Sequence, residues 1–99
     1  MEEEAKRQYI IDLYDLYGGL LTEKQKSYFE DYYFLDLSLS EMAENYGISR
    51  NGVFDQIKRA CQALEEYENH IHLKQKMCQI GSMEIDNNIK EEILNLLKE

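Results

Sequence analysis

The chain of 99 residues contains no proline, and none of its apolar runs approaches the roughly 20 residues that a membrane-spanning helix needs. The missing proline, together with frequent Ala, Leu, Glu, Lys and Gln, predicts an all-α fold. The acidic and polar start, MEEEAKRQ, lacks the apolar segment of a secretory signal. We therefore expect a protein that does not insert into a membrane and that resides in the cytoplasm.

Residues with the chemistry of catalysis or metal binding are also scarce. The only two cysteines, Cys61 and Cys78, make no disulfide framework and indicate free thiols. His70, His72 and Cys78 come nearest to a set of metal ligands, but their spacing matches no zinc site. No nucleophile with a neighbouring base, glycine-rich phosphate loop or plausible carboxylate pair stands out. We expect no enzymatic activity, no cofactor and no bound metal.

Hydrophobic periodicity and glycines outline the first two helices. Apolar and aromatic residues at three- and four-residue steps predict a helix over about 4–17. Gly18 and Gly19 should end it, because glycine reaches the left-handed conformation that helix exits favour. Thr22 begins a capping-box pattern, which predicts a second helix that runs to about Leu35.

A helix-turn-helix is predicted over about 38–60. Ser38 caps a short helix that ends at Gly47, and Ser49 caps a longer helix of about 25 residues. The apolar stripe of the longer helix consists of Val53, Phe54, Ile57, Cys61, Leu64, Tyr67 or Glu68, and Ile71. Its outward face should carry Arg50, Asn51, Asp55, Gln56, Lys58 and Arg59, the candidate residues for binding nucleic acid or a partner. In a DNA reader, arginine pairs with guanine and asparagine or glutamine with adenine, while Lys58 and Arg59 would contact phosphates.

The pattern breaks near Gly81, and a last amphipathic helix follows, with Ile85 at the start of its apolar face. The sequence thus predicts about five helices in two parts. Residues 1–76 form the helix-turn-helix domain, and residues 77–99 form a linker and a helix that docks on the same fold or on a second subunit.

The stretch LTEKQKSYFEDYYFLDLSLSEMAENYGISRNGVFDQIKRA resembles region 4 of bacterial sigma factors, the module that reads promoter DNA. It is more similar still to the small YlxM-like bacterial proteins, also in the LEEYE that follows and in total length. The resemblance covers about residues 5–75. Because the genes of that family lie beside those for signal recognition particle components, it implies a regulatory or accessory role in protein targeting, exercised by binding the particle's protein or RNA.

The alternative function is a transcription regulator that binds promoter DNA through the outward face. Residues 50–60 carry three basic side chains and one acidic one, whereas the whole chain has a formal net charge of −9. Specific DNA binders neutralise several phosphates, so this balance favours a protein partner. Gly52 departs from the family pattern and removes a side chain from the reading surface, and Asp55 adds a negative charge there.

The chain is also expected to form a homodimer. The long helix, at about 40 Å, outruns a small three-helix core, and a last helix of about 15 residues is marginal alone. The aromatic run from Tyr28 to Phe34 is interpreted as core and dimer surface rather than as a platform for RNA bases, because Glu30 and Asp31 interrupt it. The predicted interface residues are Tyr9, Leu13, Leu64, Tyr67, Ile71, Ile89, Ile93 and Leu97.

Overall fold

The computed structural model describes residues 3–82 and 86–98, and the regular elements in these ranges are all helical. They are α1 (Glu4–Tyr17), the 3-10 turn η1 (Gly18–Leu20), α2 (Glu23–Tyr33), α3 (Leu39–Tyr46), α4 (Arg50–Ile71), α5 (Leu73–Gly81) and α6 (Asn87–Lys98). The all-α class is confirmed, with six α-helices in the described ranges where the sequence predicts about five. Ile85 lies outside the described residues.

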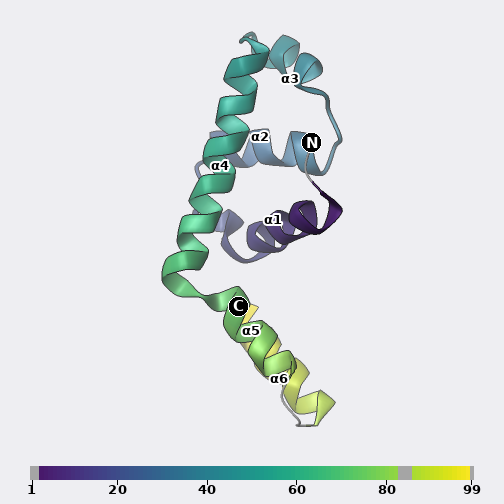
Figure 1. Cartoon of the computed structure of the whole chain (residues 1–99), viewed down its shortest axis with the longest axis vertical. Coiled ribbons are helices and arrows are strands. Elements are labelled where there is room, and N and C mark those ends of the chain that lie inside the picture. Colours follow the sequence, from purple (N-terminus) through teal and green to yellow (C-terminus); the bar gives the residue numbers. More distant parts are fainter. Residues whose placement is uncertain (1–2, 83–85, 99) are drawn as a thin grey trace.

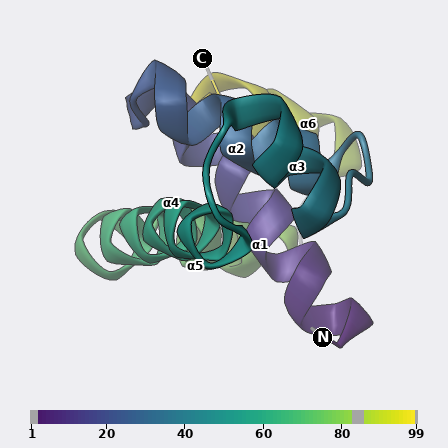
Figure 2. The same cartoon turned by 90° about the horizontal axis from the view of Figure 1, so that it is seen from above.

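The molecule is elongated, with extents of 51 × 24 × 19 Å. α4 runs along the long axis, and α1, α2 and α3 pack against it at successive levels (Figure 1). Seen from above, these three helices lie on one side of α4 (Figure 2). α5 and α6 pack on each other and form a C-terminal hairpin that continues beyond the end of α4 (Figure 1).

The hydrophobic core lies where α1, α2 and α3 meet α4. The largest fully buried side chains are Phe29, Leu13, Met42, Leu64 and Val53. Leu13 and Leu64 have no exposed surface, so their predicted place in a dimer interface is wrong. Because α1 packs across α4, the two leucines are covered within one chain and offer nothing to a second copy.

Gly18 serves close packing rather than a left-handed turn. Its φ is −54° and its backbone continues into η1, so the predicted left-handed exit is wrong. A Cβ at this position would lie 2.9 Å from Cε2 of Tyr14, whose ring stacks on Phe29 at 4.4 Å. The glycine therefore leaves room for an aromatic stack that joins α1 to α2.

α4 ends sooner than predicted, at Ile71, after 22 residues and about 33 Å. His72 has φ 58° and ψ 28°, a left-handed conformation that both ends α4 and precedes α5. α5 was not predicted, and it runs through residues 76 and 77, where the sequence places the boundary between the two parts of the chain.

A buried carboxylate joins α4 to α5. Glu68 is 7% exposed, and it accepts hydrogen bonds from the Tyr17 hydroxyl at 2.6 Å and from the backbone N–H groups of Lys74 at 3.0 Å and Gln75 at 3.2 Å. The Tyr17 hydroxyl in turn accepts from the N–H of Leu73 at 3.1 Å. Glu68 thus caps α5 from the preceding helix, where a carboxylate satisfies otherwise unpaired N–H groups.

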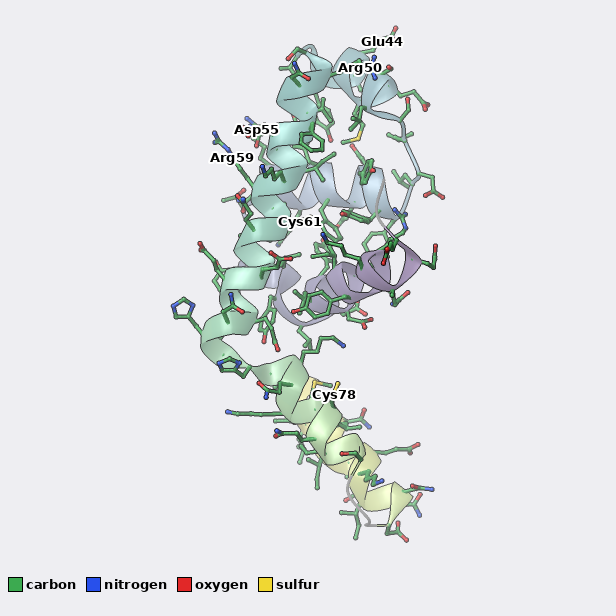
Figure 3. All side chains as sticks on the ribbon, in the orientation of Figure 1. Glu44, Arg50, Asp55, Arg59, Cys61 and Cys78 are labelled. Carbon is green, nitrogen blue, oxygen red and sulfur yellow. The ribbon has the colours of Figure 1, made fainter. Side chains whose placement is uncertain are left out.

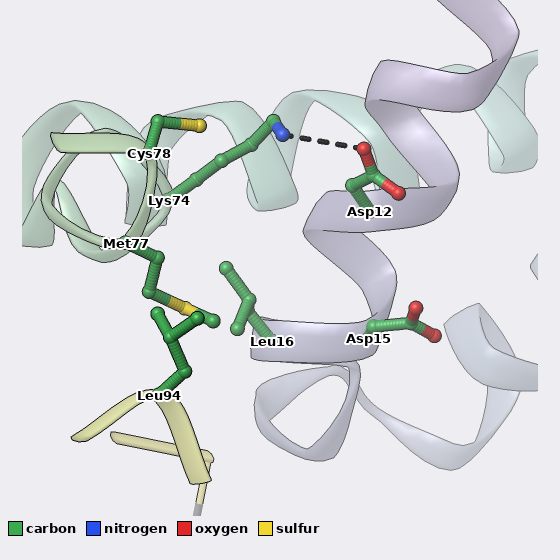
Figure 4. A pocket seen from close by; sticks show the side chains of 7 residues that line it. All are labelled: Asp12, Asp15, Leu16, Lys74, Met77, Cys78 and Leu94. Carbon is green, nitrogen blue, oxygen red and sulfur yellow. Dashed lines mark hydrogen bonds and ion pairs between the residues drawn. The ribbon is translucent and has the colours of Figure 1, made fainter. Parts of the chain in front are cut away.

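The C-terminal hairpin also contacts α1 through side chains. Lys74 Nζ lies 3.2 Å from Asp12 Oδ2 and 5.9 Å from the ring centre of Tyr9. A pocket of about 280 Å³ separates the two parts, with Leu16 of α1 facing Met77 of α5 and Leu94 of α6 (Figure 4). The hairpin is therefore attached through these polar contacts and through Leu73, which packs against the hydrophobic core.

Replacing Glu68 with alanine should destabilise the fold through this junction. The Tyr17 hydroxyl and two N–H groups of α5 would lose a charged acceptor, so we expect the free energy of unfolding to fall by about 2–4 kcal/mol. Urea denaturation followed by circular dichroism measures the change, and Glu66→Ala, at an exposed neighbour, is the matched control. Equal stability of the two variants would show that the junction contributes nothing.

Candidate binding surface of the helix-turn-helix

The helix-turn-helix consists of α3, a turn over residues 47–49 and α4. The Ser38 hydroxyl accepts from the N–H of Glu41 at 3.1 Å, and the Glu41 carboxylate accepts from the N–H of Ser38 at 3.1 Å, which confirms the predicted capping box. Gly47 ends α3 at φ 68°, and Ser49 Oγ accepts from the N–H of Gly52 at 3.0 Å at the start of α4. These local interactions orient the two helices as the sequence predicts.

Tyr46 fastens α3 to α2. Its ring stacks on Tyr28 at 4.2 Å, and its hydroxyl donates to the carboxylate of Asp31. Burial and the hydrogen bond to Asp31 raise the pKa of Tyr46 to about 12. The proton therefore stays on this hydroxyl well into the alkaline range, and the contact between the helices stays with it.

The outward face of α4 carries most of the predicted binding residues. Val53 and Ile57 hold the helix on the core, with 0% and 6% of their surface exposed. The predicted binding residues that the structure exposes are Arg50, Asn51, Asp55, Lys58 and Arg59, but Arg50 lies in the first turn on the side of Leu39 and Phe54. Gln56, the sixth predicted residue, is half-buried. Asp55 and Arg59 point away from the same side of α4, whereas Arg50 lies at the start of the helix beside α3 (Figure 3).

Part of the positive charge of this face is neutralised locally. Arg59 Nε lies 3.0 Å from Asp55 Oδ2, one helical turn away, with both side chains more than half exposed. Such an exposed pair contributes at most about 1 kcal/mol to stability. Its greater effect is on the local field, because the carboxylate offsets one of the three basic residues that could attract phosphates.

Gly52 lies against the turn. A Cβ there would be 3.2 Å from Ser49 Oγ and 3.4 Å from Ile48 Cδ1. The first carbon of a side chain at this position would therefore crowd the cap of α4. A larger residue at position 52 would therefore need a small shift of Ser49 or Ile48.

Phe54 is a functional candidate that sequence reasoning missed. It was predicted in the buried stripe, but 56% of its surface is exposed. The buried positions of α4 follow Val53, Ile57, Ala60 and Leu64, and residue 54 lies about 100° around the helix from the first of them. This angular offset from the buried stripe is the signal in the sequence that could have predicted an exposed Phe54.

Beside Phe54 lies a groove of about 390 Å³ between α1, α2, α3 and α4. We call it the Phe54 groove, and its apolar lining consists of Ile10, Tyr32, Tyr33, Leu39, Phe54, Ile57 and Cys61. Cys61 Sγ lies 3.5 Å from the Tyr33 hydroxyl, which places this half-buried thiol on the groove wall. The groove gives the helix-turn-helix an apolar surface next to its charged face.

The remaining predicted dimer residues are spread over both parts of the molecule. Tyr9, Ile71 and Ile89 are 38%, 44% and 51% exposed. Tyr67, Ile93 and Leu97 are half-buried. Tyr67 packs toward Tyr17, with ring centres 6.2 Å apart, so much of its surface is used within the chain.

Residues that could hold a metal do not gather in this fold. Among the described residues, no three His, Cys, Asp or Glu side chains lie close enough to share an ion. In the same part of the chain, none of the helices is both long and apolar enough to cross a membrane.

Comparison with known proteins agrees with this architecture. The family model described as "Putative helix-turn-helix protein, YlxM / p13 like" (UPF0122) matches residues 4–99. The chain is similar to UPF0122 proteins of Bacillus thuringiensis (strain Al Hakam) and Bacillus cereus (strain 03BB102), with 47% identity over 76 residues in each case. These residues are 77% of this chain and 66% of each relative, so the chain spans slightly less than two thirds of the curated relatives' length.

The contact between Tyr46 and Asp31 predicts a specific dependence of stability on pH. The pKa of Tyr46 is raised from 10.0 to about 12, so above pH 10 the folded state retains a proton that the unfolded state releases. The free energy of unfolding should therefore fall between pH 10 and pH 12. Tyr46→Phe should flatten this fall in urea titrations. Identical slopes for the wild type and Tyr46→Phe would contradict the assignment.

Proposed function

Because the chain belongs to the helix-turn-helix family of YlxM- and p13-like proteins, we propose that it is a non-enzymatic regulatory or accessory protein that acts by binding a protein or ribonucleoprotein. The signal recognition particle is the partner that the family resemblance implies, through its gene neighbourhood. The cytoplasmic location expected from the sequence accords with such a role and stays a prediction.

One observation carries the preference for a protein partner. The exposed part of α4 carries an ion pair, Asp55 with Arg59, and beside that charged face a half-exposed aromatic ring, Phe54, on a chain of net charge −9. A DNA reader gains affinity from each phosphate it neutralises, and an acidic body with few free cations gains little. Exposed aromatic rings bordered by charged groups are typical of protein interfaces.

A role as a DNA-binding transcription regulator is the second candidate. Arg50 and Asn51 are exposed in the first turn of α4, the part of a recognition helix that contacts base edges. Lys58 and Arg59 are exposed further along the helix, where phosphate contacts would fall. The placement of these side chains is thus compatible with DNA binding, whereas the net charge of the chain disfavours it.

We also infer a homodimer that forms through the C-terminal hairpin. α5 buries no side chain, and Ile89 and Leu96 of α6 are 51% and 68% exposed. Two short helices cannot cover their apolar sides alone. Two such hairpins would supply four helices around a shared core, which is a stable arrangement.

A salt series with duplex DNA separates the two functions. We expect no binding near physiological salt, together with retention of the protein on immobilised signal recognition particle protein from a related bacterium. Binding that weakens steeply with salt, and that is lost in Arg50→Ala with Arg59→Ala, would instead support the DNA reader. Lys24→Ala with Lys76→Ala removes the same charge at exposed positions away from α4 and is the matched control.

Sedimentation tests the homodimer. At micromolar concentration the wild type should sediment at about twice the monomer mass of 11.8 kDa. Ile89→Glu with Leu96→Glu should shift it to the monomer, because the charges would be buried without partners. Gln79→Glu with Asn88→Glu adds the same charge at exposed polar positions of the hairpin and should leave the dimer intact. A wild-type mass near 11.8 kDa would refute the dimer.

A further inference from the structure

The Phe54 groove has the size and chemistry of a site for a protein segment. Its volume of about 390 Å³ far exceeds the roughly 30 Å³ that one water occupies. Ile10 and Ile57 form a floor that is almost fully buried, whereas Phe54 stands 56% exposed at the wall. An apolar floor with an exposed aromatic wall gains free energy only when apolar side chains cover it.

The groove continues toward the start of α4. Leu39 and Phe54 line both the groove and an adjoining shallow depression that contains Arg50 and Asn51. The apolar surface is thus extended along α4 instead of forming a closed hole. An elongated segment fits such a surface better than a compact small molecule does.

Charged residues at the edges of the groove determine which net charge a bound segment should carry. Lys6 and Lys58 are exposed at its edges, Glu65 is half-buried there, and Arg50 lies in the adjoining depression. These residues are net positive on a chain whose overall charge is −9. The surface therefore favours an acidic segment, and the acidic body disfavours docking anywhere else.

The walls of the groove decide the conformation of the segment. They belong to α1, α2, α3 and α4, and away from the helix ends the backbone groups of these helices are paired within them. An extended peptide would find no row of backbone partners there and would leave most of its own N–H and C=O groups unpaired. A helix satisfies its own backbone and presents apolar side chains along one face.

We propose that the Phe54 groove receives an amphipathic α-helix of the protein partner, whose apolar face covers Phe54 and whose flanking acidic side chains lie beside Lys6 and Lys58. This inference rests on the proposed function and specifies the chemistry of the partner. A nucleic acid fits the same surface less well, because phosphates and sugars gain nothing from the apolar floor.

Two labelled peptides of about 18 residues test the proposal on the full-length chain, since shorter helices are marginal in isolation. Both carry leucine along one helical face, and the flanking positions are glutamate in the acidic peptide and lysine in the basic peptide. We expect fluorescence anisotropy to show binding of the acidic peptide and a preference for it of about tenfold or more.

Variants then assign the binding to the groove. Phe54→Ala should lower the affinity for the acidic peptide by about tenfold or more. Thermal unfolding should confirm that the substitution at this exposed position leaves the fold intact. Lys6→Glu with Lys58→Glu should reverse the preference toward the basic peptide. Lys24→Glu with Lys76→Glu changes the charge by the same amount elsewhere and should leave the preference unchanged.

The other outcomes overturn the inference. They are no peptide binding, equal binding of both peptides, affinities that the groove variants leave unchanged, and displacement of the acidic peptide by duplex DNA. A dimer that Phe54→Ala converts to monomer would assign the groove to a second copy and would also overturn the inference.

If the Phe54→Ala variant is still retained on immobilised signal recognition particle protein, the inference fails while the proposed function stands. If the wild type binds the peptide but not that protein, the pathway assignment fails and the groove stands.

Discussion

The burial of one stripe along α4 is the constraint on which the rest of the structure depends. Val53, Ala60 and Leu64 have no exposed surface, and Ile57 and Glu68 are nearly covered. α1, α2 and α3 all pack on this helix, so the stripe sets their positions relative to one another. At the N-terminal end of α4 the stripe fixes which side chains of the helix-turn-helix face outward. At the C-terminal end it brings the carboxylate of Glu68 to the start of α5. A single continuous helix therefore positions both the helix-turn-helix and the C-terminal hairpin.

The parts of the fold that the sequence predicts correctly arise within a few residues of chain. The capping boxes at Thr22 and Ser38 satisfy N–H groups three residues away, and Gly47 takes the left-handed conformation that glycine adopts most readily. The same locality explains the candidate site, since a helix phase anchored by Val53 and Ile57 places most of the charged residues outward.

The features that the sequence does not predict depend on partners far apart in the chain. The hydroxyl that Glu68 accepts from belongs to Tyr17, 51 residues earlier, and no local pattern marks the pair. Leu13 and Leu64 carry the same apolar signal whether covered by their own chain or by another, so periodicity cannot separate core from interface. Phe54 stands at the border of the stripe, where small differences in helix orientation decide between burial and exposure, and the groove beside it needs four helices to exist.

The shape of a helix-turn-helix does not by itself select DNA as the ligand. Shape places a helix where its outer side chains can reach a partner, and the chemistry of those side chains decides which partner gains free energy from the contact. Here an arginine is paired with an aspartate on its own helix, and an apolar groove lies beside the charged face. A duplex would have to approach an acidic body for few new ion pairs, and it would leave the groove uncovered. A protein partner can cover that apolar surface and pair the remaining cations in one contact, which is why we propose a protein partner.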